Sequence, residues 1–523
     1  MPLRPHSTRR HAPALTTATA LITLSSVAAC GGSTDGSDST PKAGEALKLA
    51  IQTAPNSLDP AQLTVGENGF IWSALYDTLL YTDNNGELKP NAATSWKYSD
   101  DRRTLTLKLR SGMTFSSGAE VDAAAVKATV EHTMKTAGPA RALFKRVDKV
   151  EAPDKRTVVF RLDAPDAVLL HALASEGGVI ADPRTVDDKR TARNPVSSGP
   201  YELDTNKTEA GTVFVLKRRD DYWNAKDFPF RTVDVRLMKD PGAYTNALLS
   251  GQVNAGSVRV EEEKRVLAAG FKKTDVKATA LAMLVLGDRE GEVEPALGDV
   301  RVRRAIAMAF DREKINKQLV KGAATPMQQQ FSPNGPAYDP ELDGSFDYDP
   351  KKAKELLADA GYPQGFSVRM PEIIYAKPFV PTITQALADI GIKVSWDAIP
   401  PQRTYSAYSS KKYPMYFTVE SSMAFPRELN WYIPTNTSHN PWGTRDPQLD
   451  DLMRKFHREA DPDKSAELAK QTNAFLTREV WDAPLLSLDR LWFTKDGITM
   501  LNHGESNVST LRWFGTADQG ADR

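Results

Sequence analysis

Apolar and polar residues alternate along several short segments in the first half of the chain. Leu105, Leu107 and Leu109 are separated by polar residues, and this spacing predicts a strand over residues 104–110 with one buried face. The Asp-Asn-Asn-Gly sequence at 83–86 favours left-handed backbone angles and predicts a turn. The same alternation predicts further strands at residues 47–51, 157–162 and 233–238.

A helical period of apolar residues dominates the second half of the chain. Val302, Ile306 and Phe310 share one face of the helix that this period predicts after Asp299, whose carboxylate suits an N-cap. Asp311 and Asp349 stand in the same way before two more helices. Further helices are predicted after Asp122 and at residues 243–249, 378–390, 447–460 and 465–479, and further strands at 392–396, 413–420 and 485–488. Interspersed strands and helices indicate the α/β fold class.

The first 45 residues differ in composition from the rest. Residues 1–29 combine three arginines with an uncharged run and then small residues, the pattern of an export signal peptide. The uncharged run is too short to be a stable transmembrane anchor. Residues 30–45 are rich in Gly, Ser, Thr and Asp, so they predict a flexible tether. Cys30, directly after two alanines, resembles the lipid-modified cysteine of a bacterial lipobox.

Charge and cysteine content exclude several classes of protein. The 523 residues contain 67 Lys plus Arg and 67 Asp plus Glu, so nothing indicates a nucleic-acid partner. Cys30 is the single cysteine, so no disulfide can form within the chain. The histidines are scattered without metal-ligand spacing. We therefore predict no metal site and no cofactor.

The order of residues between Leu75 and Gly118 resembles the amino-terminal signature of the family 5 extracellular solute-binding proteins. These proteins are the receptors of peptide and nickel ABC importers. The matching residues are Leu75, Tyr76, Asp77, Leu79, Leu80, Gly86, Pro90, Ala93, Ser95, Trp96, Ser99, Asp100, Leu109, Arg110, Phe115 and Gly118.

Two later segments resemble the same family in the same order. One contains Ser198, Gly199, Pro200 and Tyr201, followed by Asp221, Tyr222 and Trp223, with Ser198 in place of the usual Thr. The other reads DVRVRRAIAMAFDREKI from Asp299 and YDPKKAKELLADAGYP from Tyr348. The resemblance covers roughly residues 47–515. Trp96 and Trp223 are interpreted as structural residues.

The resemblance implies a two-lobed periplasmic-binding-protein-like α/β fold, large type II or cluster C, with an extra subdomain in the N-terminal lobe. Lobe 1 is expected at residues 46–285, with the subdomain at about 76–194, and is completed by about 490–523. Lobe 2 is expected at 286–489. The lobes would close on a solute by population shift, with strands crossing near residues 284–286 and 488–490.

Positions around the cleft of this architecture nominate the ligand-binding residues. The candidates are Glu67, Asn68, Arg403, Tyr405, Ser421, Ser422, Phe425, Trp431, Tyr432 and Trp442. Each aromatic member can instead be packed in a lobe core. Many peptide binders of the family place an aspartate just after the strand expected at 413–420. Here no acid follows it, and Glu420 can point to the other face because strand residues alternate.

The resemblance therefore implies the substrate-binding lipoprotein of an ABC importer, not an enzyme, anchored to the outer face of the cell membrane by lipidated Cys30. Its partners would be a small solute, first of all an oligopeptide, and permease and ATPase subunits. Oligosaccharides and metal chelates remain alternative solutes. A lipoprotein hydrolase is another reading, although no GxSxG motif is present. A receptor that signals without transport also stays open.

Overall fold

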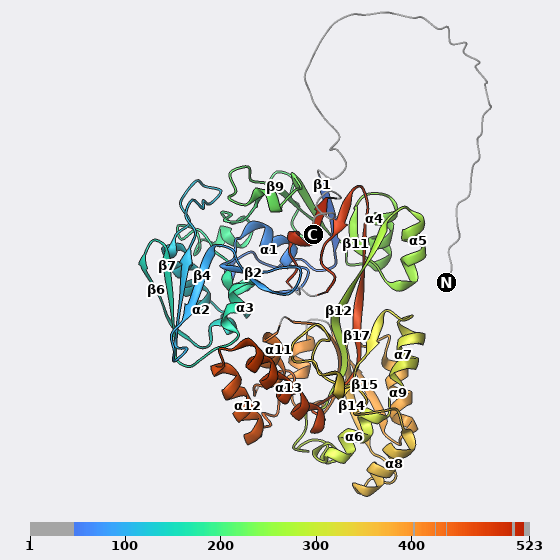
Figure 1. Ribbon diagram of the computed structural model, residues 1–523. Helices are drawn as coiled ribbons and strands as arrows, with labels where there is room; N and C mark the ends of the chain where they lie inside the picture. Colours follow the sequence, from blue (N-terminus) through green and yellow to red (C-terminus); the bar gives the residue numbers. More distant parts are fainter. Residues whose placement is uncertain (1–45, 401–402, 424, 436, 505–507, 517–523) are drawn as a thin grey trace, which may run out of the picture. The chain divides into compact units, whose positions relative to one another are not determined.

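The computed structural model describes residues 46–400, 403–423, 425–435, 437–504 and 508–516 (Figure 1). The predicted signal peptide, the tether and Cys30 lie outside the described residues. The α-helices are α1 (Gly69–Leu75), α2 (Ala123–Lys135), α3 (Leu169–Leu173), α4 (Pro241–Leu249), α5 (Glu263–Ala268), α6 (Val300–Met308), α7 (Arg312–Leu319), α8 (Pro350–Asp359), α9 (Val380–Asp389), α10 (Thr404–Tyr408), α11 (Arg427–Tyr432), α12 (Pro447–Arg458) and α13 (Pro462–Arg478).

The strands fall into several sheets. They are β1 (Ala46–Ile51), β2 (Leu80–Thr82), β3 (Leu88–Pro90), β4 (Ala93–Tyr98), β5 (Thr104–Leu109), β6 (Val147–Asp154), β7 (Thr157–Leu162), β8 (Tyr201–Leu203), β9 (Val213–Arg218), β10 (Thr232–Leu237), β11 (Ala255–Ser257), β12 (Lys272–Val285), β13 (Ala324–Pro326), β14 (Ser367–Glu372), β15 (Lys393–Ala398), β16 (Tyr416–Ser421), β17 (Asp482–Thr494), β18 (Ile498–Met500) and β19 (Phe514–Thr516).

The largest sheet among the described residues has nine strands, in the order β16-β12-β17-β11-β1-β10-β9-β8, with β13 added beside β17. β1 pairs in parallel with β10 and β11. β12 and β17 are its two long strands and pair antiparallel along most of their length. Figure 1 shows this pair running from the region of β11 and α4 to the region of β14 and α9.

Two of the predicted strands form the centre of a separate four-stranded antiparallel sheet, β4-β5-β7-β6. Leu105 and Leu107 of β5 and Val158 and Phe160 of β7 are fully buried in one cluster, as their alternation predicted. Helix α2 contributes Val126 and Val130 to the same cluster. The predicted N-cap is confirmed, since the Asp122 carboxylate accepts a hydrogen bond from Ala125 N.

Three aspartates begin helices in the second half, as predicted. Asp299 accepts from Arg301 N, Asp311 from Lys314 N and Asp349 from Lys352 N. Strands β14 and β15 pair in parallel, and helices α6, α8 and α9 bury apolar faces in one large cluster. An α/β organisation of this half therefore follows from the helical period and the caps.

Two arginines of this segment are buried and form no ion pair with a carboxylate among the described residues. Arg312 donates hydrogen bonds to the backbone carbonyls of Ala307, Phe310, Met327, Phe346 and Pro484. Arg303 donates to the carbonyls of Leu297, Gly298, Glu479 and Val480. A guanidinium has five N–H donors in a fixed fork, so each side chain ties together backbone from distant segments.

The register of the β12–β17 pair shifts at two places, between Ala282 and Met283 and, over a longer stretch, between Val276 and Ala280. Ala278 has a positive φ of 53° there. Its backbone N–H donates to Asp489 Oδ1 at 3.1 Å, and Lys277 forms an ion pair with Asp489 at 2.7 Å. The register shift and the positive φ therefore fall at the same place in β12. We call this place, residues 276–280 of β12 with Asp489 of β17, the joint of the strand pair.

The buried apolar clusters divide at this joint. One is built from residues between Leu281 and Leu486, and we call residues 280–488 the middle part. The others are built from residues between Leu47 and Val276 and between Leu491 and Phe514, and we call residues 46–276 with 490–516 the N-terminal part. The predicted lobe boundaries stay predictions, and they are taken up again below.

Some element boundaries differ from those that the sequence predicts. The strand predicted at 485–488 is β17, which extends over Asp482–Thr494 because β12, β11 and β13 all pair with it. Helix α13 begins at Pro462 rather than 465, since Asp461 caps it by accepting from Asp463 N and Lys464 N. Tertiary pairing and a second cap outweigh the local pattern in these two places.

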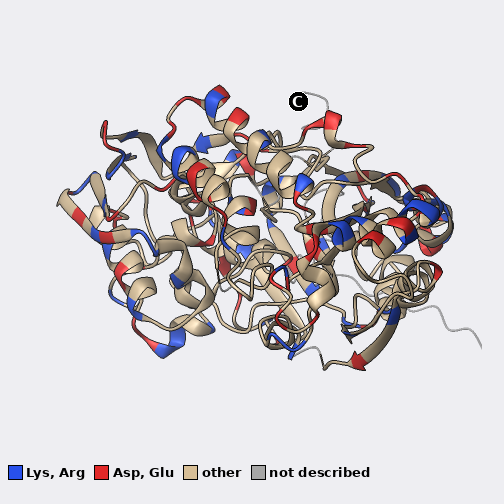
Figure 2. Cartoon of the chain, turned by 90° about the horizontal axis from the view of Figure 1, so that it is seen from below, with Lys and Arg blue, Asp and Glu red and all other residues tan. Residues whose placement is uncertain are grey.

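Charged residues of both signs are interspersed along the same elements (Figure 2). This distribution agrees with the equal numbers of basic and acidic residues in the sequence. An extended surface of one sign, which nucleic-acid binding requires, is therefore not indicated by the composition of the chain.

Candidate functional site

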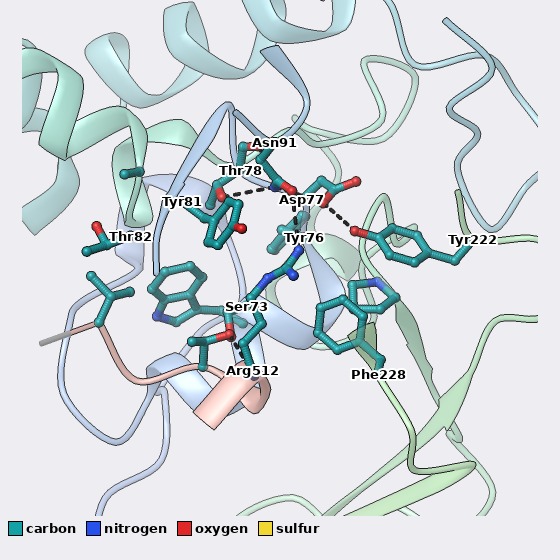
Figure 3. Close-up of a pocket in the computed structure, with 15 residues that line it drawn as sticks. Ser73, Tyr76, Asp77, Thr78, Tyr81, Thr82, Asn91, Tyr222, Phe228 and Arg512 are labelled. Carbon is teal, nitrogen blue, oxygen red and sulfur yellow. Dashed lines mark hydrogen bonds between the residues drawn. The ribbon is translucent and has the colours of Figure 1, made fainter. Parts of the chain in front are cut away.

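Residues of the sequence signature converge on one buried carboxylate, Asp77 (Figure 3). Its oxygens accept hydrogen bonds from Tyr222 Oη at 2.8 Å, Trp223 Nε1 at 2.9 Å and Asn91 Nδ2 at 3.1 Å. Its backbone N–H donates to Ser198 Oγ at 2.9 Å. Segments that are more than a hundred residues apart in the chain therefore meet at this side chain. Burial raises the pKa of Asp77, although hydrogen bonds from Trp223 and Tyr222 act in the opposite direction.

The space beside Asp77 is small. The pocket that Asp77 lines with Tyr81 and Arg512 has a free volume of about 30 Å³, and a water molecule needs roughly 10–15 Å³ of such space. The signature thus builds a polar node of the fold and leaves room for water only.

Among the predicted site residues of the N-terminal part, Glu67 is fully engaged with its surroundings. Its Oε2 accepts from the backbone N–H groups of Gln52 at 2.6 Å and Thr53 at 3.2 Å. Its Oε1 lies 3.4 Å from the Arg490 guanidinium. Glu67 therefore joins the end of β1 to β17, close to the joint in the strand pair.

Asn68, the second predicted residue of this loop, keeps a free acceptor. Its Nδ2 donates to Thr64 Oγ1 at 2.8 Å, and its Oδ1 is buried with no hydrogen-bond partner among the described residues. Beside this loop, Gln52, Tyr244 and Arg259 line a pocket of about 230 Å³. No periodicity or motif in the sequence indicated this pocket.

The predicted residues of the middle part include an aromatic pair, the exposed Tyr405 and the half-buried Trp431. Tyr405 is 65 % exposed, and its ring centroid lies 6.5 Å from that of Trp431. Partial burial raises the pKa of Tyr405, and Glu420 and Tyr375 contribute to the shift. The ring centroid of Tyr405 also lies 6.5 Å from that of Tyr408, which stacks flat on Tyr416 at 3.9 Å. Tyr405 is thus the exposed end of a row of rings.

Tyr375 was not predicted as a site residue, although it is 60 % exposed and lies close enough to Tyr405 to affect its pKa. It follows β14, as Tyr405 follows β15, and these two strands are parallel. Loops at the carboxyl ends of parallel strands meet at one edge of a sheet. The alternation of Val368 and Met370, both buried in β14, is the signal that would have predicted this strand and its loop.

The indole of Trp431 is hydrogen-bonded to a cluster of charged side chains that is largely buried. Its Nε1 donates to Glu420 Oε2 at 2.8 Å. The same oxygen lies 2.9 Å from His439 Nε2, and His439 Nδ1 lies 3.5 Å from Asp482 Oδ2. His439 is 1 % exposed, so this imidazole is enclosed between two carboxylates.

The two main partners of this cluster stabilise each other's charged form. Burial by itself would lower the pKa of His439, but Glu420 and Asp482 raise it to about 9. Burial by itself would raise the pKa of Glu420, but the charge of His439 and hydrogen bonds from His439 and Trp431 lower it. The Glu420 carboxylate therefore faces His439 and Trp431, and His439 belongs to the group that supports the site. In the sequence it was one of the scattered histidines.

The remaining predicted residues lie in different environments. Tyr432 is buried with its ring 4.7 Å from His439, and Trp442 is buried beside Gly287. Phe425 packs on Phe456 at 5.6 Å. Arg403, Ser421 and Ser422 complete the set: Arg403 and Ser421 are exposed, whereas Ser422 is buried and its Oγ has no partner among the described residues.

Neither a metal site nor a membrane-spanning helix is present among the described residues. No group of three or more His, Cys, Asp and Glu side chains in that part of the chain has an arrangement that could hold a metal ion. Within the same residues, every helix is too short or too polar to cross a membrane.

Comparison with known proteins adds to this geometry. Residues 87–443 match the family model described as bacterial extracellular solute-binding proteins, family 5 Middle. The glutathione-binding protein GsiB of Escherichia coli O1:K1 / APEC is 26% identical over 468 residues, which cover 85% of this chain and 89% of GsiB.

Solved structures with the same fold include proteins with different solutes. The DppA protein of Helicobacter pylori in complex with peptide STSA has a TM-score of 0.77 and 23% identity, covering 90% of this chain and 98% of DppA. NikZ of Campylobacter jejuni in complex with Ni(L-His) has a TM-score of 0.72 and 19% identity, covering 89% of this chain and 96% of NikZ. The predicted two-lobed α/β fold class is confirmed by these likenesses.

Proposed function

Since the chain belongs to family 5 of the bacterial extracellular solute-binding proteins, we propose that it captures a peptide-like solute and delivers it to an ABC permease. The sequence resemblance to this family is confirmed, and solute binding is the function of the family. The observation that carries the proposal is the family match over residues 87–443, together with the likeness of the fold to DppA and NikZ.

A peptide or peptide-like compound is our first choice of solute. GsiB is named as a glutathione-binding protein, and the DppA structure contains the peptide STSA. Both relatives support this class of solute. The segment after β16 contains no acid, and the Glu420 carboxylate is engaged with His439 and Trp431. The amine of a bound peptide would therefore need a partner other than Glu420. Oligosaccharides and metal chelates stay as second choices, the latter because of Ni(L-His) in NikZ.

We propose that the solute lies between the N-terminal part and the middle part, against residues of the predicted set. Exposure supports Tyr405, Arg403 and Ser421 as contacts, and free acceptors support Asn68 and Ser422. Glu67, Phe425, Tyr432 and Trp442 are engaged with the protein itself and would position the others.

The predicted lobes, residues 46–285 with about 490–523 and residues 286–489, belong to the same proposal. The division of the buried clusters near residues 276–281 and 486–491 supports them. The joint at Ala278 and Asp489 would be the place where the lobes swing. Closure over a solute would then follow by population shift.

Lipidation and the partner subunits are further parts of the proposal. Cys30 would carry the lipid that holds the protein at the outer face of the membrane, and permease and ATPase subunits would receive the solute. The sequence of residues 1–30 supports this. Replacement of Cys30 by Ala should release the protein into the medium or leave it uncleaved, and unchanged membrane attachment would contradict the anchor.

A binding screen tests the proposed function directly. The purified protein is titrated with a tetrapeptide, glutathione, a disaccharide and nickel-histidine, and binding is followed by tryptophan fluorescence and by the melting temperature. A peptide or glutathione should raise the melting temperature in a concentration-dependent way, since a ligand stabilises the state that it binds. If only the disaccharide or only nickel-histidine binds, the solute is an oligosaccharide or a metal chelate and the peptide proposal is wrong.

The rival readings differ in what happens after binding. Mass spectrometry of the released solute should show an unchanged molecule, whereas a cleaved product would favour a hydrolase. Loss of solute uptake on gene deletion, with co-purification of a permease, would support transport. Intact uptake in the deletion strain would favour the signalling receptor.

A further inference from the structure

A buried ion pair joins the N-terminal part to the middle part away from the strand joint. Arg427 Nη2 lies 2.9 Å from Glu176 Oε1, and Arg427 Nη1 lies 3.2 Å from Glu176 Oε2. Arg427 Nη1 also donates to Ser175 Oγ at 3.1 Å. The two charged side chains are 14% and 6% exposed, so water reaches little of this contact.

Each partner is fixed within its own part. Glu176 begins a short 3-10 helix, Glu176–Gly178, next to α3, whose Leu169 and Leu173 are buried in the cluster around β5 and β7. Arg427 begins α11, whose Leu429 and Tyr432 are buried in the large cluster of the middle part. The ion pair therefore connects two separate cores.

Helix α11 also carries Trp431, which holds the exposed Tyr405 at the candidate site. Arg427 directly follows the segment 421–426, where three of the predicted site residues lie. The ion pair thus involves the first residue of the helix that supports the site.

We propose that Arg427 and Glu176 form a latch that favours the closed arrangement of the two parts when no solute is bound. The proposal deepens the proposed function, because it concerns the regulation of the same site. His171, whose pKa is lowered to about 4 by burial and by Arg427, stays neutral beside the pair and adds no competing positive charge.

The electrostatics of a buried pair predict how variants behave. Removal of one partner leaves the other charge buried and unpaired, which is strongly unfavourable in the closed arrangement. The remaining charge regains water only when the parts separate, so a single substitution favours the open arrangement. Replacement of both partners by neutral side chains removes this penalty.

Solution scattering and hydrogen exchange of the solute-free protein test the latch. Glu176→Gln should increase the radius of gyration and raise amide exchange in α11 and in residues 175–178 roughly tenfold or more, while exchange in β4–β7 stays unchanged. The double variant Glu176→Gln with Arg427→Met should also be more open than the wild type, because it lacks the latch, but no more open than either single variant, because it carries no unpaired buried charge. Glu151→Gln, which breaks an exposed ion pair with Arg161 in β6 and β7, is the matched control and should change nothing at α11.

Unchanged scattering and exchange in Glu176→Gln would overturn the latch, and so would a double variant as closed as the wild type, because the pair would then contribute nothing to closure. If a single variant does not fold, as judged by loss of its far-ultraviolet circular dichroism, the test uses the double variant, which carries no unpaired charge. Because no solute is added, failure of the binding screen leaves this test intact, and failure of this test leaves the solute proposal intact.

Discussion

Asp77, which is buried, and Glu420, whose side chain is 12% exposed, lie in different parts of the molecule, and their pKa values shift in opposite directions. Asp77 accepts hydrogen bonds from Tyr222, Trp223 and Asn91, which are neutral donors. Glu420 faces the imidazole of His439 at 2.9 Å, with Asp482 on the other side of that ring. The comparison shows that neutral donors do not compensate for burial here, whereas a paired charge does.

The difference separates two uses of a buried acid. The Asp77 node joins the signature segments to one another, and its charge is not needed for that. The Glu420 cluster fixes Trp431 beneath the exposed Tyr405 and depends on ionisation of both partners. Variants at the two clusters should therefore differ in size of effect and in their response to pH.

The largest effect is expected for His439→Gln. It leaves Glu420 and Asp482 buried with no cation between them, and removal of one partner of a buried pair costs about 3–5 kcal/mol. Urea unfolding at pH 7 measures the loss. His503→Gln, at an exposed histidine, is the control and should be nearly neutral. A loss below about 1 kcal/mol for His439→Gln would mean that the cluster is uncharged.

A smaller loss is expected for Asp77→Asn. The amide still accepts from some of the donors but points an NH₂ group at the others, and an unsatisfied buried group costs about 1–3 kcal/mol. Glu420→Gln is the paired variant and should cost more, because it removes the charge that His439 needs. Equal losses for the two variants would contradict the distinction between the clusters.

The pH dependence of stability should reveal the charged cluster. The pKa of His439 is about 9 in the folded protein against an ordinary 6.5, so the folded protein holds a proton that the unfolded chain releases between these values. The free energy of unfolding should be highest below pH 6.5 and fall as pH rises to about 9, by at most about 1.4 kcal/mol per pH unit for one proton.

His439→Gln should flatten this fall. Glu428, whose pKa burial raises to about 8, contributes a fall of the same sign beginning at lower pH, so Glu428→Gln separates the two contributions. Denaturant unfolding at intervals between pH 5 and 9 provides the measurement. If the free energy of unfolding of the His439 variant falls with pH as steeply as that of the wild type, the pH dependence arises from other groups.

The smallest effect on stability is expected for Tyr405→Ala, at the exposed end of the ring row. Surface substitutions usually change the free energy of unfolding by less than about 0.5 kcal/mol. Solute affinity should nevertheless fall roughly tenfold, since an aromatic contact contributes about 0.5–1.5 kcal/mol beyond the area it buries. Tyr348→Ala, another exposed tyrosine, is the control. Unchanged affinity would remove Tyr405 from the site.

The sequence predicted most of the elements because their signals are local. Asp122, Asp299 and Asp349 precede apolar residues at helical spacing, and each caps a helix in the structure. β17 extends far beyond its apolar run, because its length is set by the strands that pair with it. Pairing of this kind depends on residues far away in the chain and leaves little trace in the local pattern.

The candidate site was harder to predict for a similar reason. His439 meets Glu420 and Asp482, which are 19 and 43 residues away, so no spacing rule identifies the cluster. Trp431 and Tyr432 are neighbours in α11, yet Tyr432 is buried and Trp431 is only partly so. A six-residue helix is too short for its periodicity to indicate which ring faces outward.

The contacts of Arg312 and β17 affect when the chain can fold during synthesis. Arg312 needs the carbonyl of Pro484, and both parts of the molecule need β17 as a sheet partner. Neither part can reach its final packing before residues 482–494 have left the ribosome. A nascent chain of this kind stays incompletely packed until residues 482–494 have been synthesised, however early its other helices and strands form.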